Sequence, residues 1–296
     1  MVGSLLHSCG LSLGPEDELK HPAHDNPEGY FENRSFVLLN EELMSQFGGS
    51  WDNPPNFHED WEATSKVSRL VERAENLIVK SRAACWGWKD PRNSLTLPFW
   101  QRLLPDLKVI VCVRNPLEVA RSLFLRGDAS EPSQFQLWLT YYRRLLASTS
   151  AEQRLVTHYQ SYFQSAPAEL RRVLDWLEVE VSDETLAEAC AHTSAGLRHH
   201  YVTTADLFEA RVPDEVLGLY LNLCAEAGPV YQQARNNETL DDQSRAFVHD
   251  NEVSELWTEL QQVRAEAAAR EQTLNEILDS RAFKLASWYW RRRGRK

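Results

Sequence analysis

The spacing of apolar residues along the chain predicts alternating strands and helices. Residues 107–113 (LKVIVCV) show no polar alternation, which predicts a strand buried on both faces, as in a parallel sheet. Residues 154–163 (RLVTHYQSYF) predict another strand, and residues 84–92 (ACWGWKDPR) predict a buried strand that delivers charged residues to a site. Helical spacing occurs in seven segments: 1–9, 33–47, 62–82, 94–105, 116–127, 135–148 and 166–179. This alternation favours a three-layer α/β fold in which helices flank a mainly parallel sheet.

The C-terminal part of the chain has a different composition. We expect four parts: a domain over 1–235, a polar linker over 236–250, a helix over 251–280 and a tail over 281–296. Apolar residues at alternating steps of three and four, from Val253 to Ile277, predict a short coiled coil. Arg270 interrupts this seam, and a helix packed on the body is the alternative. The tail combines aromatic residues with seven Lys or Arg and no acidic residue, a composition typical of an interfacial membrane anchor.

Composition and charge restrict the classes of function. The 296 residues carry a formal net charge of −11, which argues against a nucleic-acid-binding protein, since such proteins need a basic surface. Five cysteines are scattered without a CxxC pair, a pattern that fits reduced thiols rather than a disulfide framework or a zinc site. The sequence contains no run of about 20 apolar residues, so it does not predict a membrane-spanning helix. We therefore expect a cytoplasmic protein, with the tail as the part that would place it peripherally on the inner face of the membrane.

Arg114 follows the predicted strand 107–113, and Ser122 lies on the helix after it. Ligands of open parallel sheets gather beyond the carboxyl ends of the strands, and the amino end of the next helix faces the same crevice. A guanidinium, a hydroxyl and backbone N–H groups in that place make a phosphate pocket. The alternative, on these two residues alone, is a surface arginine and a helical serine without a role.

A longer block adds to this pattern. Residues 86–123 (WGWKDPRNSLTLPFWQRLLPDLKVIVCVRNPLEVARSL) resemble the sulfotransferase family, whose members transfer a sulfuryl group from 3′-phosphoadenosine 5′-phosphosulfate (PAPS) to a hydroxyl or an amine. Arg114, Pro116 and Ser122 match that family's 3′-phosphate-binding segment. The Lys-Asp-Pro at residues 89–91 is similar to the tyrosylprotein and some glycan-directed branches. The resemblance implies a P-loop-type parallel sheet flanked by helices.

The resemblance covers roughly residues 1–200. Tyr159 takes the place of the family's nucleotide-contacting tyrosine, although Gln160 and Ser161 replace the usual acidic pair. In the family, a phosphate loop of the type R-S-G-T-S/T precedes a helix that reads much like residues 1–10, and this sequence contains no such loop. The chain as written therefore lacks the cradle for the donor's 5′-phosphosulfate. We expect the coding sequence to begin further upstream, the alternative being a genuine fragment.

The resemblance also implies roles for single residues. Glu32, in GYFENR, occupies the place of the catalytic glutamate of tyrosylprotein-type enzymes, and Lys89 that of a lysine that stabilises the leaving oxygen. Arg198, next to two histidines, would close over the nucleotide or the acceptor. Each has an ordinary alternative: a carboxylate at a helix start, a lysine paired with Asp90, and an arginine in a solvated loop. No metal is required, because the donor is already activated.

We interpret the chain as a sulfotransferase that uses PAPS and acts on a hydroxyl acceptor, a glycan or glycolipid. The tail and the tryptophans in loops favour this acceptor, since indole rings stack on sugars, although such residues also form cores. The alternative is a non-catalytic scaffold that acts through its coiled coil, which would also support a homo-oligomer. A P-loop kinase would share the architecture, but the sequence has no Gly-Lys-Ser/Thr to hold a triphosphate and magnesium.

Overall fold

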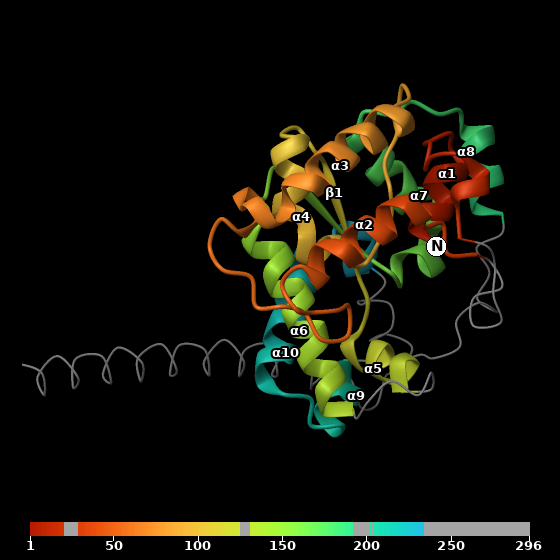
Figure 1. Cartoon of the computed structure of the whole chain (residues 1–296). Helices are drawn as coiled ribbons and strands as arrows, with labels where there is room; N and C mark the ends of the chain where they lie inside the picture. The colour runs from red at the N-terminus through yellow and green to blue at the C-terminus, as the bar shows by residue number, and fades with distance from the viewer. Residues whose placement is uncertain (21–28, 125–130, 192–201, 203, 234–296) are drawn as a thin grey trace, which may run out of the picture. The chain divides into compact units, whose positions relative to one another are not determined.

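The computed structural model describes most of the first 233 residues of the chain (Figure 1). It leaves out residues 21–28, 125–130, 192–201, 203 and 234–296. The predicted linker, coiled coil and tail therefore lie outside the described residues, as does Arg198. The described residues all belong to one compact unit, Met1–Glu238.

Helices make up most of the described residues, and each of the seven predicted helical segments overlaps one of them (Figure 1). The described residues form ten α-helices: α1 (Val2–Ser8), α2 (Arg34–Ser45), α3 (Ser68–Ser81), α4 (Asn93–Leu103), α5 (Pro116–Phe124), α6 (Glu131–Ala147), α7 (Ser161–Leu177), α8 (Asp183–Cys190), α9 (Thr204–Glu209) and α10 (Asp214–Glu226). Local chemistry fixes several of their starts. The side chain of Asn33 accepts the Ser35 N–H and caps α2, and Pro116 opens α5, where its missing N–H costs nothing.

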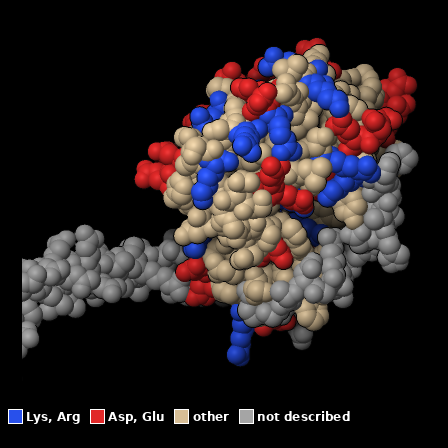
Figure 2. All heavy atoms as spheres, viewed as in Figure 1, with Lys and Arg blue, Asp and Glu red and all other residues tan. Residues whose placement is uncertain are grey.

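The surface carries charges of both signs. In the view of Figure 2, lysine and arginine side chains lie between aspartate and glutamate side chains over the upper part of the molecule, and uncharged side chains cover much of the centre. Among the described residues, no helix has the length and apolar character to cross a membrane.

The sheet contains two parallel strands within the described residues. β1 (Val109–Val113) pairs with β2 (Arg154–His158) in a register that places Val109 opposite Arg154 and Val113 opposite His158. The mixed helix and strand composition with a parallel sheet confirms the α/β class, although the sheet is smaller than the sequence predicts.

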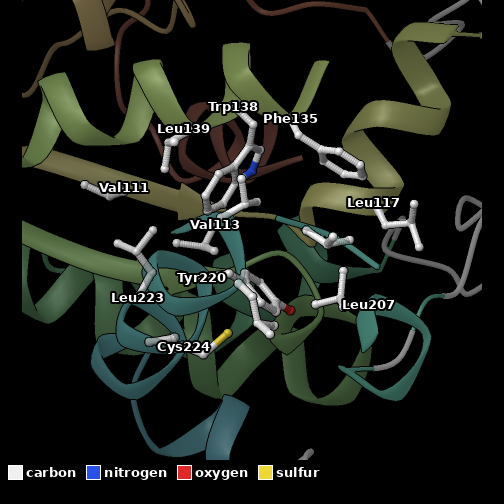
Figure 3. Close-up of a cluster of buried hydrophobic side chains, with 14 of the residues drawn as sticks. Val111, Val113, Leu117, Phe135, Trp138, Leu139, Leu207, Tyr220, Leu223 and Cys224 are labelled. Atoms are coloured by element: carbon white, nitrogen blue, oxygen red, sulfur yellow. The ribbon is translucent and has the colours of Figure 1, made fainter. Parts of the chain in front are cut away.

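Helices cover both faces of this sheet. Val111, Val113 and Val156 pack into a cluster with side chains of α5, α6, α9 and α10 (Figure 3). Ile110 and Leu155 pack on the other side, against a cluster formed by α1, α7 and α8. A third cluster joins α2, α3 and α4. Successive side chains of a strand point to opposite faces. On one face Val111 and Val113 are buried, whereas on the other Ile110 is half-buried and Cys112 is exposed, so the predicted burial of β1 on both faces holds only in part.

The prediction of a strand over residues 84–92 is wrong. Within the part of the chain that the structure describes, only Trp86 of this segment forms a β-bridge, a single parallel one to Ser12. The segment around Ser12 is extended for a short distance because Gly10 and Gly14, on either side, have φ values of +90° and +96°. These left-handed turns end the extended segment, so no longer partner is available to residues 84–92.

Candidate active site

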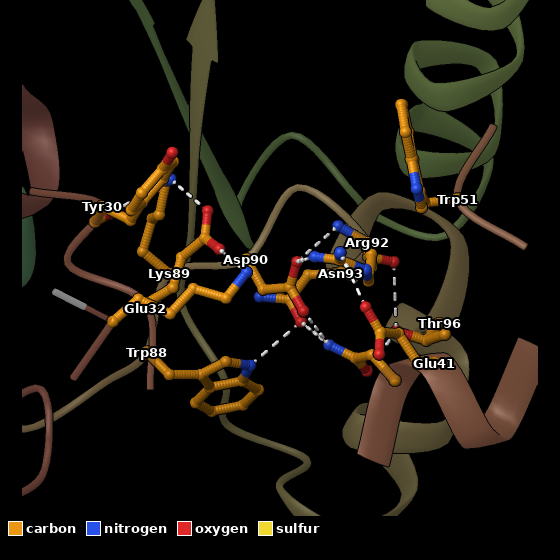
Figure 4. A network of polar contacts seen from close by, with 12 residues as sticks. Tyr30, Glu32, Glu41, Trp51, Trp88, Lys89, Asp90, Arg92, Asn93 and Thr96 are labelled. Carbon is orange, nitrogen blue, oxygen red and sulfur yellow. Dashed lines mark hydrogen bonds and ion pairs between the residues drawn. The ribbon is translucent and has the colours of Figure 1, made fainter. Parts of the chain in front are cut away.

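Glu32 is held between two lysines immediately before α2. The backbone N–H of Lys20 donates to the backbone carbonyl oxygen of Glu32 at 2.8 Å, and this hydrogen bond joins the two segments. The Glu32 side chain is only 6% exposed; its Oε1 accepts from Lys89 Nζ at 2.6 Å and its Oε2 from Lys20 Nζ at 3.0 Å. Lys89 Nζ also donates to Tyr30 O at 3.3 Å (Figure 4). The two residues predicted to carry the chemistry, Glu32 and Lys89, therefore meet.

Electrostatics keep the Glu32 carboxylate ionised. Burial alone would raise its pKa, but the positive charges of Lys89 and Lys20 outweigh burial and hold the pKa below its ordinary value of 4.5. The two lysine side chains are 43% and 33% exposed, so water reaches them and screens both ion pairs. Glu32 is thus a carboxylate at neutral pH, the form that a general base needs.

A buried polar network fixes the Lys-Asp-Pro-Arg segment behind this pair (Figure 4). Asp90 accepts from Asn40 Nδ2 at 2.8 Å through Oδ2 and from Arg92 Nη1 at 2.9 Å through Oδ1. Asn40 is itself fully buried, and its Oδ1 accepts from Trp100 Nε1 at 2.8 Å. Because every partner comes from α2, α4 or the turn before α4, the network fixes the backbone that carries Lys89.

Arg114 is held in place at the carboxyl end of β1. Its Nε donates to Glu118 Oε2 at 2.8 Å, and its guanidinium carbon lies 4.7 Å from the centre of the Tyr159 ring. Tyr159 reaches this place because its N–H donates to Val113 O at 2.8 Å, which extends the pairing of β1 and β2 by one residue. Trp138 Nε1 donates to Arg114 O at 3.3 Å. Strand register thus brings together the arginine and the tyrosine predicted to contact nucleotide.

The remaining predicted site residues differ in what the structure shows of them. Ser122 is half-buried on α5, four positions after Glu118 and therefore on the same face of the helix. Arg198 lies outside the described residues. Two residues at the site were not among the sequence predictions, Lys20 and Glu118. Glu118 could have been found as an acid four positions after Arg114, whereas Lys20 gives no local signal because only a tertiary contact brings it to Glu32.

Comparison with known proteins identifies the family. A family profile described as "Sulfotransferase family" matches residues 17–183, more than half of the 296 residues. The chain belongs to the sulfotransferase family. A Caenorhabditis briggsae protein named "Putative protein-tyrosine sulfotransferase" is 28% identical over 107 residues, which make up 33% of this chain and 38% of that protein. The match thus spans less than half of the relative, and no solved structure matches the chain significantly.

The part of the chain that matches the family profile includes both pairs of residues described above. Residues 17–183 contain Glu32 with Lys89 and Arg114 with Tyr159, and Arg198 lies beyond them. The family assignment is thereby confirmed over residues 17–183, which include the block 86–123 that carries the resemblance. Within the described ranges, no group of three or more His, Cys, Asp or Glu residues is arranged to hold a metal ion.

Three loop tryptophans within the described residues differ in their surroundings: two are packing residues, and one lies at the edge of the network. Trp61 is buried and stacks on Phe57 with ring centres 3.9 Å apart, and Trp88 stacks on Phe36 at 4.5 Å. These two rings contact protein, as the alternative of core residues predicts. Trp51 is half-buried and lies on the Arg92 side of the network, at the opposite end from Glu32 (Figure 4).

Proposed function

We propose that this chain transfers a sulfuryl group from PAPS to a hydroxyl group of an acceptor. The observation that carries the proposal is the 2.6 Å contact between Glu32 and Lys89, two residues 57 positions apart in the chain. One is a carboxylate able to take a proton, and the other is a cation able to offset charge on a leaving group. Sulfuryl transfer needs both functions within reach of one reacting centre.

Each of these residues has its own task in the reaction. PAPS, when bound, supplies a sulfuryl group that its phosphate has already activated. Glu32 takes the proton of the acceptor hydroxyl while the hydroxyl oxygen attacks sulfur and the bond from sulfur to the bridging phosphate oxygen breaks. Lys89 turns its ammonium group to that bridging oxygen and offsets the negative charge that develops there. Lys20 remains on Glu32 as its counter-charge when Lys89 moves.

The donor's ribose 3′-phosphate would be held by Arg114, with Ser122 supplying a hydroxyl and Tyr159 a ring beneath the guanidinium. Support comes from the geometry of Arg114. Its Nε is taken by Glu118, while the side chain remains 30% exposed, so the two Nη groups can serve a ligand. A guanidinium fork of this kind matches two phosphate oxygens.

The acceptor we propose is the hydroxyl of a glycan or glycolipid. Trp51 supports this assignment, because an indole at the edge of a polar network can stack on a sugar ring while charged groups bind its hydroxyls. Arg92 and Glu41, which form a 2.9 Å ion pair at the same end of the network in Figure 4, are the charged groups. A tyrosine side chain, which the name of the C. briggsae relative suggests, is the competing acceptor.

Two measurements test this function. Calorimetry with adenosine 3′,5′-bisphosphate should show binding to the wild-type chain and a loss on the order of 100-fold in Arg114→Ala, because two charge-assisted hydrogen bonds disappear. Arg143→Ala is the matched control, since Arg143 is an exposed arginine that pairs with Glu215 on the surface, and it should bind as the wild type does. Equal affinity in all three proteins would refute the nucleotide site.

The second measurement follows transfer of radiolabelled sulfate from PAPS to saccharides and to a tyrosine peptide. Glu32→Gln and Lys89→Ala should abolish incorporation while leaving binding of the bisphosphate within a few-fold. Incorporation into the peptide alone would replace the glycan acceptor by tyrosine. Bisphosphate binding without transfer to any acceptor would favour a non-catalytic scaffold.

A further inference from the structure

We infer that Glu118 is a positioning residue that aims the two Nη groups of Arg114 at the ribose 3′-phosphate of the donor. This inference rests on the proposed function, because it concerns the same phosphate site. It goes further by assigning a role to a carboxylate at a place where a second anion has to bind.

The contacts of Glu118 show that it is an internal anchor rather than a surface partner. Its side chain is 2% exposed, against 30% for Arg114. One carboxylate oxygen, Oε2, accepts from Arg114 Nε at 2.8 Å, and the other, Oε1, accepts from the Val202 N–H at 3.3 Å. A buried carboxylate is stable only when donors satisfy its oxygens, and here each oxygen has a donor. Glu118 therefore has a fixed orientation before any ligand arrives.

Val202 is fixed from the other side by a neighbour of Arg114. Asn115 Nδ2 donates to Val202 O at 3.3 Å, while Asn115 Oδ1 accepts from the Leu117 N–H at 3.0 Å in the first turn of α5. The side chains of Asn115 and Glu118 thus form hydrogen bonds with the backbone C=O and the backbone N–H of Val202, respectively. The frame that holds the Glu118 carboxylate is itself part of the buried core, since Asn115, Leu117 and Val202 are all buried.

This frame determines which donors of Arg114 face a ligand. A guanidinium has one N–H on Nε and four on its Nη atoms. Glu118 takes the Nε donor and the Tyr159 ring covers one face of the group at 4.7 Å. Among the described residues, no hydrogen bond or ion pair uses either Nη atom of Arg114. A side chain held at Nε and at one face loses little freedom when a phosphate binds, so its affinity for phosphate is higher than that of a mobile arginine.

Two hypotheses about Glu118 predict changes of opposite sign. If Glu118 only neutralises Arg114, then Glu118→Gln removes a negative charge near the phosphate, and phosphate should bind more tightly. If Glu118 positions Arg114, the same variant weakens binding, because glutamine has one acceptor oxygen for the two donors, Arg114 Nε and the Val202 N–H, that Glu118 satisfies. We expect weakening of about three- to tenfold, the effect of releasing one long side chain.

The experiment is calorimetry with adenosine 3′-monophosphate and adenosine 5′-monophosphate as probes. Glu118→Gln should weaken binding of the 3′-phosphate and leave the 5′-phosphate unchanged, and it should have no further effect on an Arg114→Ala background. Glu169→Gln is the control for mere loss of a buried pair, because Glu169 is fully buried and pairs with Arg172 three positions away. This control should lower the urea midpoint without changing the preference for the 3′-phosphate.

A second variant covers the case in which Glu118→Gln fails to fold. Arg114→Lys keeps the charge and the partner of Glu118 but has no fork, so it should lose the preference for the 3′-phosphate. Unchanged or tighter binding of the 3′-phosphate in Glu118→Gln would overturn the role of Glu118 alone. Wild-type affinity for the 3′-phosphate in Arg114→Lys would overturn the guanidinium fork, on which both the role of Glu118 and the proposed phosphate site depend. Failure of the wild type to bind either adenosine 3′,5′-bisphosphate or the 3′-monophosphate would instead overturn the proposed function.

Discussion

Replacement of Asn40 by alanine should destabilise the fold severely. The amide of Asn40 makes four hydrogen bonds in a fully buried position: to Asp90 and Asn93 through Nδ2, and from Thr96 and Trp100 through Oδ1. Thr96 and Asn93 keep a second partner in the variant, Arg92 O and Trp88 Nε1 respectively. Trp100 Nε1 and Asp90 Oδ2 have no other hydrogen bond in the described structure, so these two groups lose their partners.

The magnitude follows from these two groups. A buried polar group without a partner costs about 1–3 kcal/mol, and more if it is charged, so the two together should cost roughly 3–6 kcal/mol. Typical domains have only about 5–15 kcal/mol of total stability, so Asn40→Ala should remove a large part of it. Urea unfolding monitored by tryptophan fluorescence measures the change. A loss below about 1 kcal/mol with an unchanged m-value would refute the reasoning, because it would mean that water or rearranged side chains satisfy both groups.

Two companion variants test the reasoning further. Thr96→Val removes one hydrogen bond to Asn40 with little change of shape, and it should cost only about 1 kcal/mol. Asn40→Asp places a carboxylate oxygen where Asn40 Nδ2 now lies, 2.8 Å from Asp90 Oδ2. The two carboxylates would then share a proton in the folded chain, which raises the pKa of the pair. The folded state therefore binds more protons than the unfolded state, and the deficit in stability of Asn40→Asp should shrink as pH falls towards 5, by about 1 kcal/mol or more.

Three further predictions concern other parts of the chain. The pKa of Glu32 is lowered in the folded state, so Glu32 contributes stability above about pH 4.5 that is lost as pH falls through the folded pKa. In Glu32→Gln, the free energy of unfolding measured with urea should therefore fall less steeply as pH is lowered than it does in the wild type. Burial raises the pKa of the Cys9 thiol, so Cys9→Ser should leave unchanged the number of thiols that a disulfide reagent labels rapidly in the native protein. Gly14→Ala should cost at least about 1 kcal/mol more than Gly10→Ala, because both have positive φ but only a Cβ at Gly14 meets Asn33, at 2.5 Å. Equal costs would contradict this account of Gly14.

Local patterns in the sequence predicted the elements that depend on burial alone. The uninterrupted apolar run of β1 correctly indicated a strand, and its side chains contact clusters on opposite sides of the sheet, but one of these sides is incompletely covered because Cys112 is exposed. The proximity of Arg114 and Tyr159 could also be predicted, since both follow parallel strands and the carboxyl ends of such strands meet at one edge.

Features that depend on a distant partner could not be predicted in this way. Residues 84–92 have the composition of a strand, but pairing stops at one bridge because the partner segment at Ser12 is bounded by two glycines with positive φ. Neither segment alone contains that information. The contact of Lys20 with Glu32 likewise joins a loop to a helix start, and no periodicity in either sequence indicates it.

The pairing of Glu32 with two lysines resolves a conflict in the proposed mechanism. Lys89 must leave Glu32 in order to reach the bridging oxygen, and a buried carboxylate that loses its sole partner is destabilised by about 3–5 kcal/mol. A penalty of that size would slow the reaction by a factor of roughly 150 to 5,000. Lys20 remains on Oε2 when Lys89 leaves Oε1, so Glu32 keeps a counter-charge throughout. The remaining cost is that of breaking one partly exposed ion pair, about 1 kcal/mol or less. The second lysine thus allows one carboxylate to serve as the resting partner of Lys89 and as the base of the reaction.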